Sequence, residues 1–230
     1  MHYQFIDTQS ADDFTHRAVE LLTHHIQRAI ETHGSCVMGL SGGSTPRPIY
    51  EALGKQPLNW SKVFVFLIDE RHVDPSSEDS NQKLVRDTLL KHAHIPEENM
   101  VFPDTALPVH DCVKKYAEDL KAQWENRLPD ISVLGMGPDG HIASLFPLLT
   151  EKETHERALA LHTTTDRFAV HDRITVGLHV IAAIDTHLFL LKGDEKKRVW
   201  DEMIASQDNL HRWPAKFVIQ SSDVTALWTA

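Results

Sequence analysis

The chain has 230 residues, of which 41% are hydrophobic, so it is long enough for one large α/β domain with a filled core. Its formal net charge of −10 at pH 7 argues against nucleic acid or an anionic membrane as a partner, although a few local cations would suffice for a phosphorylated ligand. No apolar run reaches membrane-spanning length.

The start of the chain and its cysteines lead us to expect a cytoplasmic protein. Residues 1–5 lack the basic start and the apolar stretch of a signal peptide. Cys36 and Cys112 lie far apart in the sequence and are expected to be reduced. No HExxH or CxxC pattern occurs, so we expect neither a metal nor another cofactor.

The first half of the chain alternates between helical and extended patterns. Residues 10–33 have apolar side chains at helical spacing, Ser10 can cap the start of this helix, and Gly34 can end it. The apolar run 63–68 is typical of a central parallel strand that is covered on both faces. Also predicted are a strand over 36–40, a helix over 49–54, a helix starting at Ser80 or Asn81, and a helix over 109–127.

The second half continues the alternation less regularly. Strands are predicted near 131–136, 158–162, 174–176 and 188–191, a helix follows Gly193, and the chain closes with 216–219 and an edge strand over 224–228. Because strands alternate with helices, we predict a Rossmann-like, doubly wound α/β fold with a mainly parallel sheet and helices on both faces. Without repeats or a composition break, one domain is expected over 1–230. The polar segment 70–80 is expected to be a mobile loop beside a site.

The turn over residues 135–141 is the most informative segment. It follows an apolar strand and contains three glycines, Asp139 and His141. Open α/β sheets bind ligands at the carboxyl ends of their strands, where this turn would lie. His141 is a natural general base at neutral pH, and Asp139 could orient or charge it. The alternative is a glycine-rich turn with an exposed histidine.

The loop over residues 41–46 joins a predicted strand to a predicted helix. Glycine backbone N–H groups, two hydroxyls and a helix N-terminus all favour an anion there, so Gly43, Ser44 and Thr45 are candidate phosphate ligands. The pattern is neither a Walker loop nor GxGxxG. The alternative is a tight turn with a Ser/Thr cap.

Charged residues follow the most apolar strand. Asp69, Glu70 and Arg71 must be paired or must face a cleft. Arg71 could clamp a phosphate, and a neighbouring carboxylate could hold a sugar hydroxyl, although a local ion pair would also explain them. Arg173 and Lys196 are further candidate cations that could equally be solvated surface charges.

Taken together, these loops resemble the signatures of 6-phosphogluconolactonases, the lactonase branch of the glucosamine/galactosamine-6-phosphate isomerase family. The order and spacing of the segments match as well. The segments that carry the resemblance are 41–46, 69–73 with Ser80-Asn81, and 135–147, and weaker similarity is found at 173–175 and 193–196.

The resemblance implies hydrolysis of 6-phospho-D-glucono-1,5-lactone to 6-phospho-D-gluconate in the oxidative pentose phosphate pathway. His141 would be the catalytic general base that activates a water, and Asp139 would orient it, without metal or covalent intermediate. The expected phosphate ligands are Gly43, Ser44, Thr45, Arg71, Arg173 and Lys196. The expected sugar contacts are Asp69 and Gly42. The partner would be this small phosphosugar lactone, and the protein a monomer or weak homodimer.

Two other functions remain open. Deaminases of the same family resemble Asp-Glu-Tyr where this chain has residues 69–71, and their active-site glutamate maps onto Phe146, which cannot transfer a proton. Ile142, however, takes a position that is usually threonine in lactonases and is isoleucine in the deaminases. A non-catalytic sugar-phosphate sensor is the other alternative, but it would not need Asp139 and His141 together.

Overall fold

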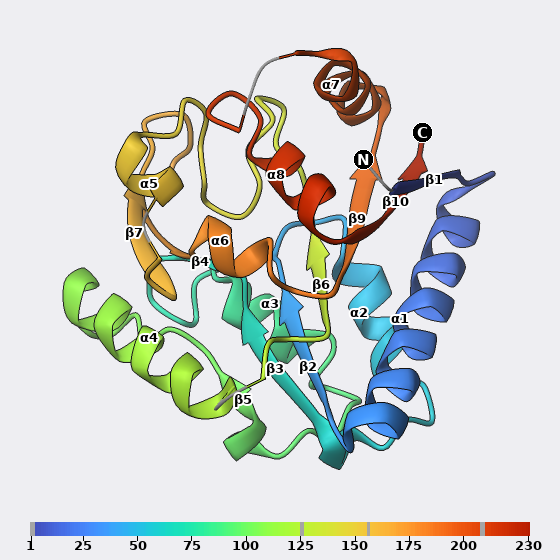
Figure 1. The fold of residues 1–230 in the computed structure, drawn as a ribbon. Helices are drawn as coiled ribbons and strands as arrows, with labels where there is room; N and C mark the ends of the chain where they lie inside the picture. The colour runs from blue at the N-terminus through green and yellow to red at the C-terminus, as the bar shows by residue number, and fades with distance from the viewer. Residues whose placement is uncertain (1–2, 125–126, 156, 208–209) are drawn as a thin grey trace.

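A seven-stranded sheet forms the centre of the computed structural model, which describes residues 3–124, 127–155, 157–207 and 210–230 (Figure 1). Its strands are β1 Tyr3–Asp7, β2 Cys36–Leu40, β3 Val63–Leu67, β5 Met100–Val101, β6 Ile131–Leu134, β9 Thr186–Lys192 and β10 Asp223–Thr229. Their order across the sheet is β1-β10-β9-β6-β2-β3-β5, and every neighbouring pair is parallel.

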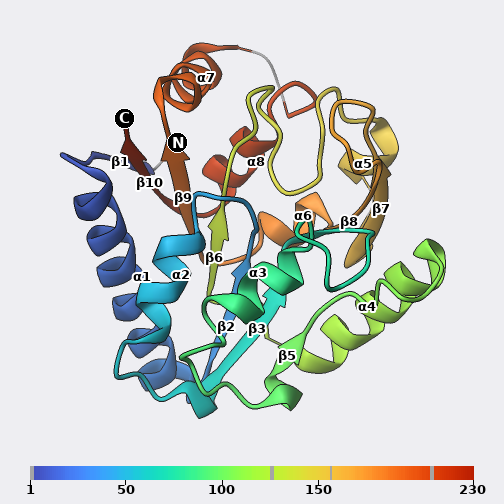
Figure 2. The ribbon, with the colours of Figure 1, turned by 180° about the vertical axis from the view of Figure 1, so that it is seen from behind.

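Helices cover both faces of this sheet, which confirms the predicted doubly wound α/β fold. On one face lie α1 Ala11–His33, α2 Arg47–Gly54 and α3 Asn81–Asp87 (Figure 2). On the other lie α4 Val109–Trp124, α6 Leu178–Ile181, α7 Asp194–Ala205 and α8 Pro214–Ser221. Successive strand residues enter opposite cores: Met38 of β2 packs with the first group of helices and Val37 with the second. This burial on two sides is why the central strands are continuous apolar runs.

The first helix confirms its sequence-based prediction at both ends. The Ser10 hydroxyl accepts a hydrogen bond from the backbone N–H of Asp13 at 3.1 Å, and so caps one of the free N–H groups of the first turn. Gly34 ends the helix in the left-handed conformation with φ of 82°. The apolar stripe of this helix packs onto the sheet.

A second, three-stranded antiparallel sheet has the order β4-β8-β7 and was not predicted as a separate unit. It consists of β4 Asp69–Arg71, β8 Asp172–Val176 and β7 Ala160–Thr164, and the short helix α5 Glu151–His155 precedes β7. The chain crosses from one sheet to the other at Ile68, whose N–H donates to Leu40 of β2 and whose carbonyl accepts from Val176 of β8. The charged segment 69–71 is therefore itself a strand, and β8 holds it in place.

At the ends of the chain, one sequence-based prediction is wrong and two elements were not assigned. The strand near 224–228 was expected at the edge of the sheet, but β10 lies between β9 and β1. The strand at this edge of the sheet is β1, whose short and largely exposed sequence has no clear strand pattern. Residues 216–219 belong to helix α8.

No helix in the described part of the chain is both long and apolar enough to cross a membrane.

Candidate functional site

The candidate site lies where the strand order reverses direction. From β2 the chain first builds the sheet outward through β3 and β5, and then returns to place β6 on the other side of β2. The loops after β2 and β6 diverge at such a switch point and leave a crevice at the carboxyl ends of the strands. A cavity of about 300 Å³ occupies this position. Every predicted site residue except Asp139 lines it: Gly42, Gly43, Ser44, Thr45, Asp69, Arg71, His141, Arg173 and Lys196.

The loop after β2 has the open geometry of an anion cradle. Gly43 has φ of 99°, which a residue with a side chain rarely adopts. Gly42 is required for a different reason, because a Cβ there would lie 1.7 Å from the side-chain oxygen of Asn81. The loop leads into α2, whose first turn has no side-chain cap. Pro48 has no N–H, so the donors of this first turn that remain for a negatively charged ligand are the N–H groups of Arg47 and Ile49.

Glu70 holds the segment after β3 in position and does not face the cavity. Its buried carboxylate accepts hydrogen bonds from the N–H groups of Arg71, Asn81 and Gln82 and from the hydroxyl of Ser80. Burial raises the pKa of Glu70, although these N–H donors favour its charged form. The carboxylate thus ties β4 to the start of α3.

Asp69, by contrast, lines the cavity. Its Oδ2 accepts a hydrogen bond from the hydroxyl of Ser144 at 2.9 Å, and its backbone carbonyl accepts one from the side-chain amide of Asn81 at 2.8 Å. The second carboxylate oxygen, Oδ1, has no hydrogen bond among the described residues and can accept one from a ligand hydroxyl.

Two arginines meet across the small sheet on the cavity wall. Arg71 of β4 and Arg173 of β8 are register partners, and Arg173 is only 6% exposed. In the described part of the chain neither forms an ion pair with a carboxylate: Arg71 donates to the carbonyl of Asp79 at 2.5 Å, and Arg173 to that of Val170 at 3.0 Å. Burial, and after it the charge of Arg71, lowers the pKa of Arg173.

One donor of this arginine pair is unsatisfied. The Nε of Arg71 is buried and has no hydrogen-bond partner among the described residues, and the same holds for the hydroxyl of Ser41 on the cavity wall. Buried donors without partners are rare because each costs free energy. Two adjacent positive charges with a spare donor form a site that an anion would stabilise.

His141 and Asp139 form a hydrogen-bonded dyad on the turn after β6. Asp139 Oδ1 lies 2.6 Å from Nδ1 of the imidazole, and it also accepts from the backbone N–H of His141 at 3.2 Å. Partial burial alone would raise the pKa of Asp139, but hydrogen bonds and positive charge from His141 and Arg167 hold it below the usual range. The Nε2 atom of His141 has no hydrogen bond among the described residues.

The glycines of this turn make room for the dyad. A Cβ on Gly137 would lie 2.0 Å from Nδ1 of His141, so only glycine lets the imidazole pack against the backbone here. Gly140 has φ of 87°, and a Cβ there would lie 2.4 Å from the ring of Trp213. The glycine spacing noted in the sequence thus has a direct steric reason.

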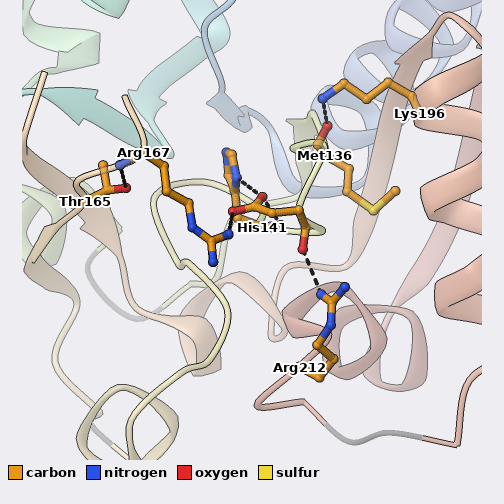
Figure 3. Close-up of polar contacts among 7 residues, drawn as sticks. Met136, His141, Thr165, Arg167, Lys196 and Arg212 are labelled. Atoms are coloured by element: carbon orange, nitrogen blue, oxygen red, sulfur yellow. Dashed lines mark hydrogen bonds and ion pairs between the residues drawn. The ribbon is translucent and has the colours of Figure 1, made fainter. Parts of the chain in front are cut away.

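Lys196 reaches the same cavity from the first turn of α7. Its ammonium donates a hydrogen bond to the carbonyl of Met136, as Figure 3 shows. Burial lowers the pKa of Lys196, and the carboxylates of Glu195 and Asp139 oppose this shift. Its backbone contact lies on the turn that carries His141, whereas the arginine pair lies on the small sheet.

Sequence reasoning missed two arginines that hold Asp139. Arg167 donates to Asp139 Oδ2 at 2.5 Å, and Arg212 donates to the backbone carbonyl of Asp139 at 2.7 Å (Figure 3). These contacts join residues 28 and 73 positions apart in loops without regular structure. No local pattern in the sequence signals either contact.

Apolar rings enclose the imidazole. The centroid of Phe146 lies 4.9 Å from that of His141, and the centroid of Phe168 lies 5.5 Å away. Both phenylalanines line the cavity. Ile142, in contrast, is fully buried in the core and does not line the cavity.

Among the described residues no group of three or more histidine, cysteine, aspartate or glutamate side chains is arranged to hold a metal ion. Both cysteines are free and buried, away from the cavity. The polar groups that line the cavity are therefore suited to an anionic, hydroxylated ligand beside a histidine–carboxylate dyad.

Comparisons with known proteins agree with this geometry. A family model described as glucosamine-6-phosphate isomerases/6-phosphogluconolactonase matches residues 9–228. A Dictyostelium discoideum protein named "Probable 6-phosphogluconolactonase" is 40% identical over 225 residues, which are 96% of this chain and 95% of that protein. The 6-phosphogluconolactonase of Neisseria meningitidis serogroup B is 34% identical over 226 residues, with 94% of each chain covered.

Solved structures match over the full fold. The crystal structure of 6-phosphogluconolactonase from Thermotoga maritima has a TM-score of 0.89 at 28% identity, and the match covers 99% of this chain and all of that one. A 6-phosphogluconolactonase structure from Plasmodium vivax also has a TM-score of 0.89, at 27% identity, covering 98% of this chain and 89% of that one.

Proposed function

Because the chain belongs to the family of glucosamine-6-phosphate isomerases and 6-phosphogluconolactonases, in its lactonase branch, we propose that it hydrolyses 6-phospho-D-glucono-1,5-lactone to 6-phospho-D-gluconate. The observation that carries this proposal is that the His141 imidazole shares one cavity with Arg71 and Arg173, which form no ion pair with a carboxylate in the described part of the chain. The names of the similar proteins support the same activity.

The phosphate of the substrate binds at the loop after β2 and at the arginine pair, in the cavity that also holds His141. The Gly43, Ser44 and Thr45 segment offers hydroxyls and N–H groups, and Arg71 and Arg173 supply the opposite charge. Remote binding of the phosphate fixes the lactone carbonyl in the cavity, so part of the binding energy is used for orientation. Asp69 accepts a hydrogen bond from a sugar hydroxyl.

Hydrolysis begins with a water molecule beside the imidazole. With its Nδ1 proton held by Asp139, His141 takes a proton from water through Nε2 as the water oxygen attacks the lactone carbonyl carbon. Asp139 stabilises the imidazolium that forms. As the tetrahedral intermediate collapses, the bond to the ring oxygen breaks, and the imidazolium returns its proton to that oxygen. No metal or covalent intermediate is needed, because a lactone is an activated ester.

Lys196 has a second role in this scheme besides its expected contact with the phosphate. Its ammonium already binds the Met136 carbonyl on the turn that carries the dyad, and two of its N–H donors remain available. It can therefore attract the anionic substrate toward the catalytic end of the cavity.

Phe146 favours hydrolysis over the isomerase or deaminase alternative. Its ring lies beside His141 at the position where the deaminases have a proton-transferring glutamate, and an apolar ring cannot replace a carboxyl group. The dyad itself favours an enzyme over a sensor, because a sensor would have no use for an oriented base. The cytoplasmic location and the monomeric or weakly dimeric state stay predictions from the sequence.

The test is lactone turnover against the spontaneous background reaction. The lactone is generated in situ from glucose 6-phosphate, and 6-phosphogluconate formation is followed with and without the protein. A parallel assay measures ammonia release from glucosamine 6-phosphate. Catalysed lactone opening without ammonia release supports the proposal. Ammonia release, or tight 6-phosphogluconate binding without lactone turnover, would contradict it.

A further inference from the structure

Both oxygens of the Asp139 carboxylate are engaged, and by partners from different parts of the chain. Oδ1 accepts from the His141 ring at 2.6 Å, while Oδ2 accepts from Arg167 at 2.5 Å (Figure 3). The Asp139 side chain is 16% exposed and that of Arg167 is 55% exposed, so the arginine reaches inward from the surface. The carboxylate is thus fixed between a ring in the cavity and a guanidinium outside it.

Arg167 is not among the residues that line the cavity, and it reaches the dyad through Asp139. It lies in the loop between β7 and β8, where its N–H donates to the hydroxyl of Thr165 at 3.2 Å. Thr165 in turn donates its N–H to the carbonyl of His171 at 3.1 Å, which closes the loop on itself. The neighbouring Phe168 packs its ring against His141. This loop therefore supports the dyad from the side of the small sheet.

We propose that Arg167 is a positioning residue for the lactone hydrolysis proposed above. By holding Oδ2, it turns Oδ1 toward Nδ1 of His141, which keeps the ring proton on Nδ1 and leaves Nε2 as the base. Without the arginine the carboxylate can rotate, and the imidazole loses its fixed orientation and tautomer. The inference rests on the proposed function, because only a catalytic histidine requires this orientation.

The charge of Arg167 also affects the pH dependence. Asp139 contacts His141 on its own turn, and Arg212 binds the backbone carbonyl of Asp139. The charged groups that line the cavity with His141 are Asp69, Arg71, Arg173 and Lys196. Arg167 partly neutralises Asp139, which would otherwise stabilise the imidazolium more strongly. Removing the arginine charge therefore favours protonation of His141 and moves the acidic limb of kcat/KM to higher pH.

The experiment compares Arg167→Ala and Arg167→Lys with the wild type over a range of pH. We expect Arg167→Ala to lower kcat about two- to fivefold, the range of a partly exposed ion pair, and to leave KM unchanged. Its acidic limb should move up by about half a pH unit. Because Arg167→Lys keeps the positive charge, its acidic limb of kcat/KM should lie at the wild-type pH, and it should retain more of the wild-type kcat than Arg167→Ala does. Arg28→Ala, on an exposed face of α1, is the matched control.

A double-variant cycle tests the route through Asp139. In the Asp139→Asn background, Arg167→Ala should have no further effect on kcat, because the carboxylate that it orients is already gone. Additive losses, an altered KM, or an acidic limb that stays in place would overturn the proposal. A general loss of folding would reduce activity without moving the limb.

A readout without substrate separates this inference from the proposed function. Histidine-selective NMR of the ligand-free protein follows the His141 imidazole, assigned by comparison with His141→Asn. Its titration midpoint should rise in Arg167→Ala and stay in place in Arg28→Ala. An unchanged midpoint would overturn the positioning role even if the enzyme hydrolyses the lactone. A risen midpoint in a protein without lactonase activity would refute the proposed function instead.

Discussion

His141 is the residue whose loss tests the chemistry most directly. Because a positioned general base contributes about 10²–10⁴-fold to a rate, we expect His141→Ala to lower kcat by that factor. Binding of 6-phosphogluconate should persist, since the arginine pair and the loop after β2 are untouched. Steady-state kinetics and isothermal titration calorimetry measure the two quantities separately. Retention of full activity would remove His141 from the mechanism.

Arg71 is expected to act on binding more than on the chemical step. Its unpartnered Nε and the facing Arg173 suit a planar, bidentate contact with a phosphate. Arg71→Ala should raise KM about 10- to 100-fold, the range for a charge-assisted hydrogen bond, with a smaller effect on kcat. Arg71→Lys is the matched control, because lysine keeps the positive charge but cannot make the planar, bidentate contact. Unchanged KM and kcat in Arg71→Ala would exclude the clamp.

At the scale of elements, β6 and β9 share a buried polar pair away from the cavity. The hydroxyl of Ser132 and Nδ1 of His187 lie 2.6 Å apart, and both residues are fully buried. Nε2 of His187 is buried without a hydrogen-bond partner in the described part of the chain. Burial lowers the pKa of His187 from 6.5 to about 3, because a charge at this place would have no compensation.

This histidine should make stability depend on pH. Below pH 6.5 the unfolded chain binds a proton at His187, whereas the folded protein does not until about pH 3. The free energy of unfolding therefore decreases as the pH is lowered from 6.5 toward 3. The expected loss from pH 7 to pH 5 is about 2 kcal/mol. Urea unfolding at both pH values measures it. The Ser132→Ala/His187→Leu double variant removes both polar groups and should lack this part of the loss. An equal loss in both proteins would contradict the assignment.

The elements also show what a sequence can and cannot predict. Helix α1 is predictable because its apolar period, Ser10 cap and Gly34 stop are all local features. The small sheet is not, because β4 pairs with β8 about 100 residues further along the chain, and the three charged residues of β4 have no strand pattern of their own. The position of β10 inside the sheet depends on β1, which is short and exposed.

At the scale of the whole molecule, the cavity depends on the switch in strand order between β2 and β6. Residues of both halves of the chain meet there, from the loops after β2 and β6, from strands β4 and β8, and from helix α7. The glycine-rich loops were predictable because strand ends in open α/β sheets have a known location. Arg167 and Phe168 were not, because tertiary contact alone brings the β7–β8 loop to the dyad.

A ligand that joins these segments should stabilise the entire fold. Because 6-phosphogluconate would bind the folded protein and not the unfolded chain, a concentration of 100 times Kd should add about 2.7 kcal/mol. For a domain of this size that corresponds to a rise in Tm of about 5–10 °C, measurable by calorimetry. Gluconate, which lacks the phosphate, is the matched ligand control and should give almost no shift. Arg71→Ala should need a much higher concentration of 6-phosphogluconate for the same shift. If gluconate and 6-phosphogluconate stabilised the protein equally, the phosphate would contribute nothing to binding, and the arginine pair would not be its site.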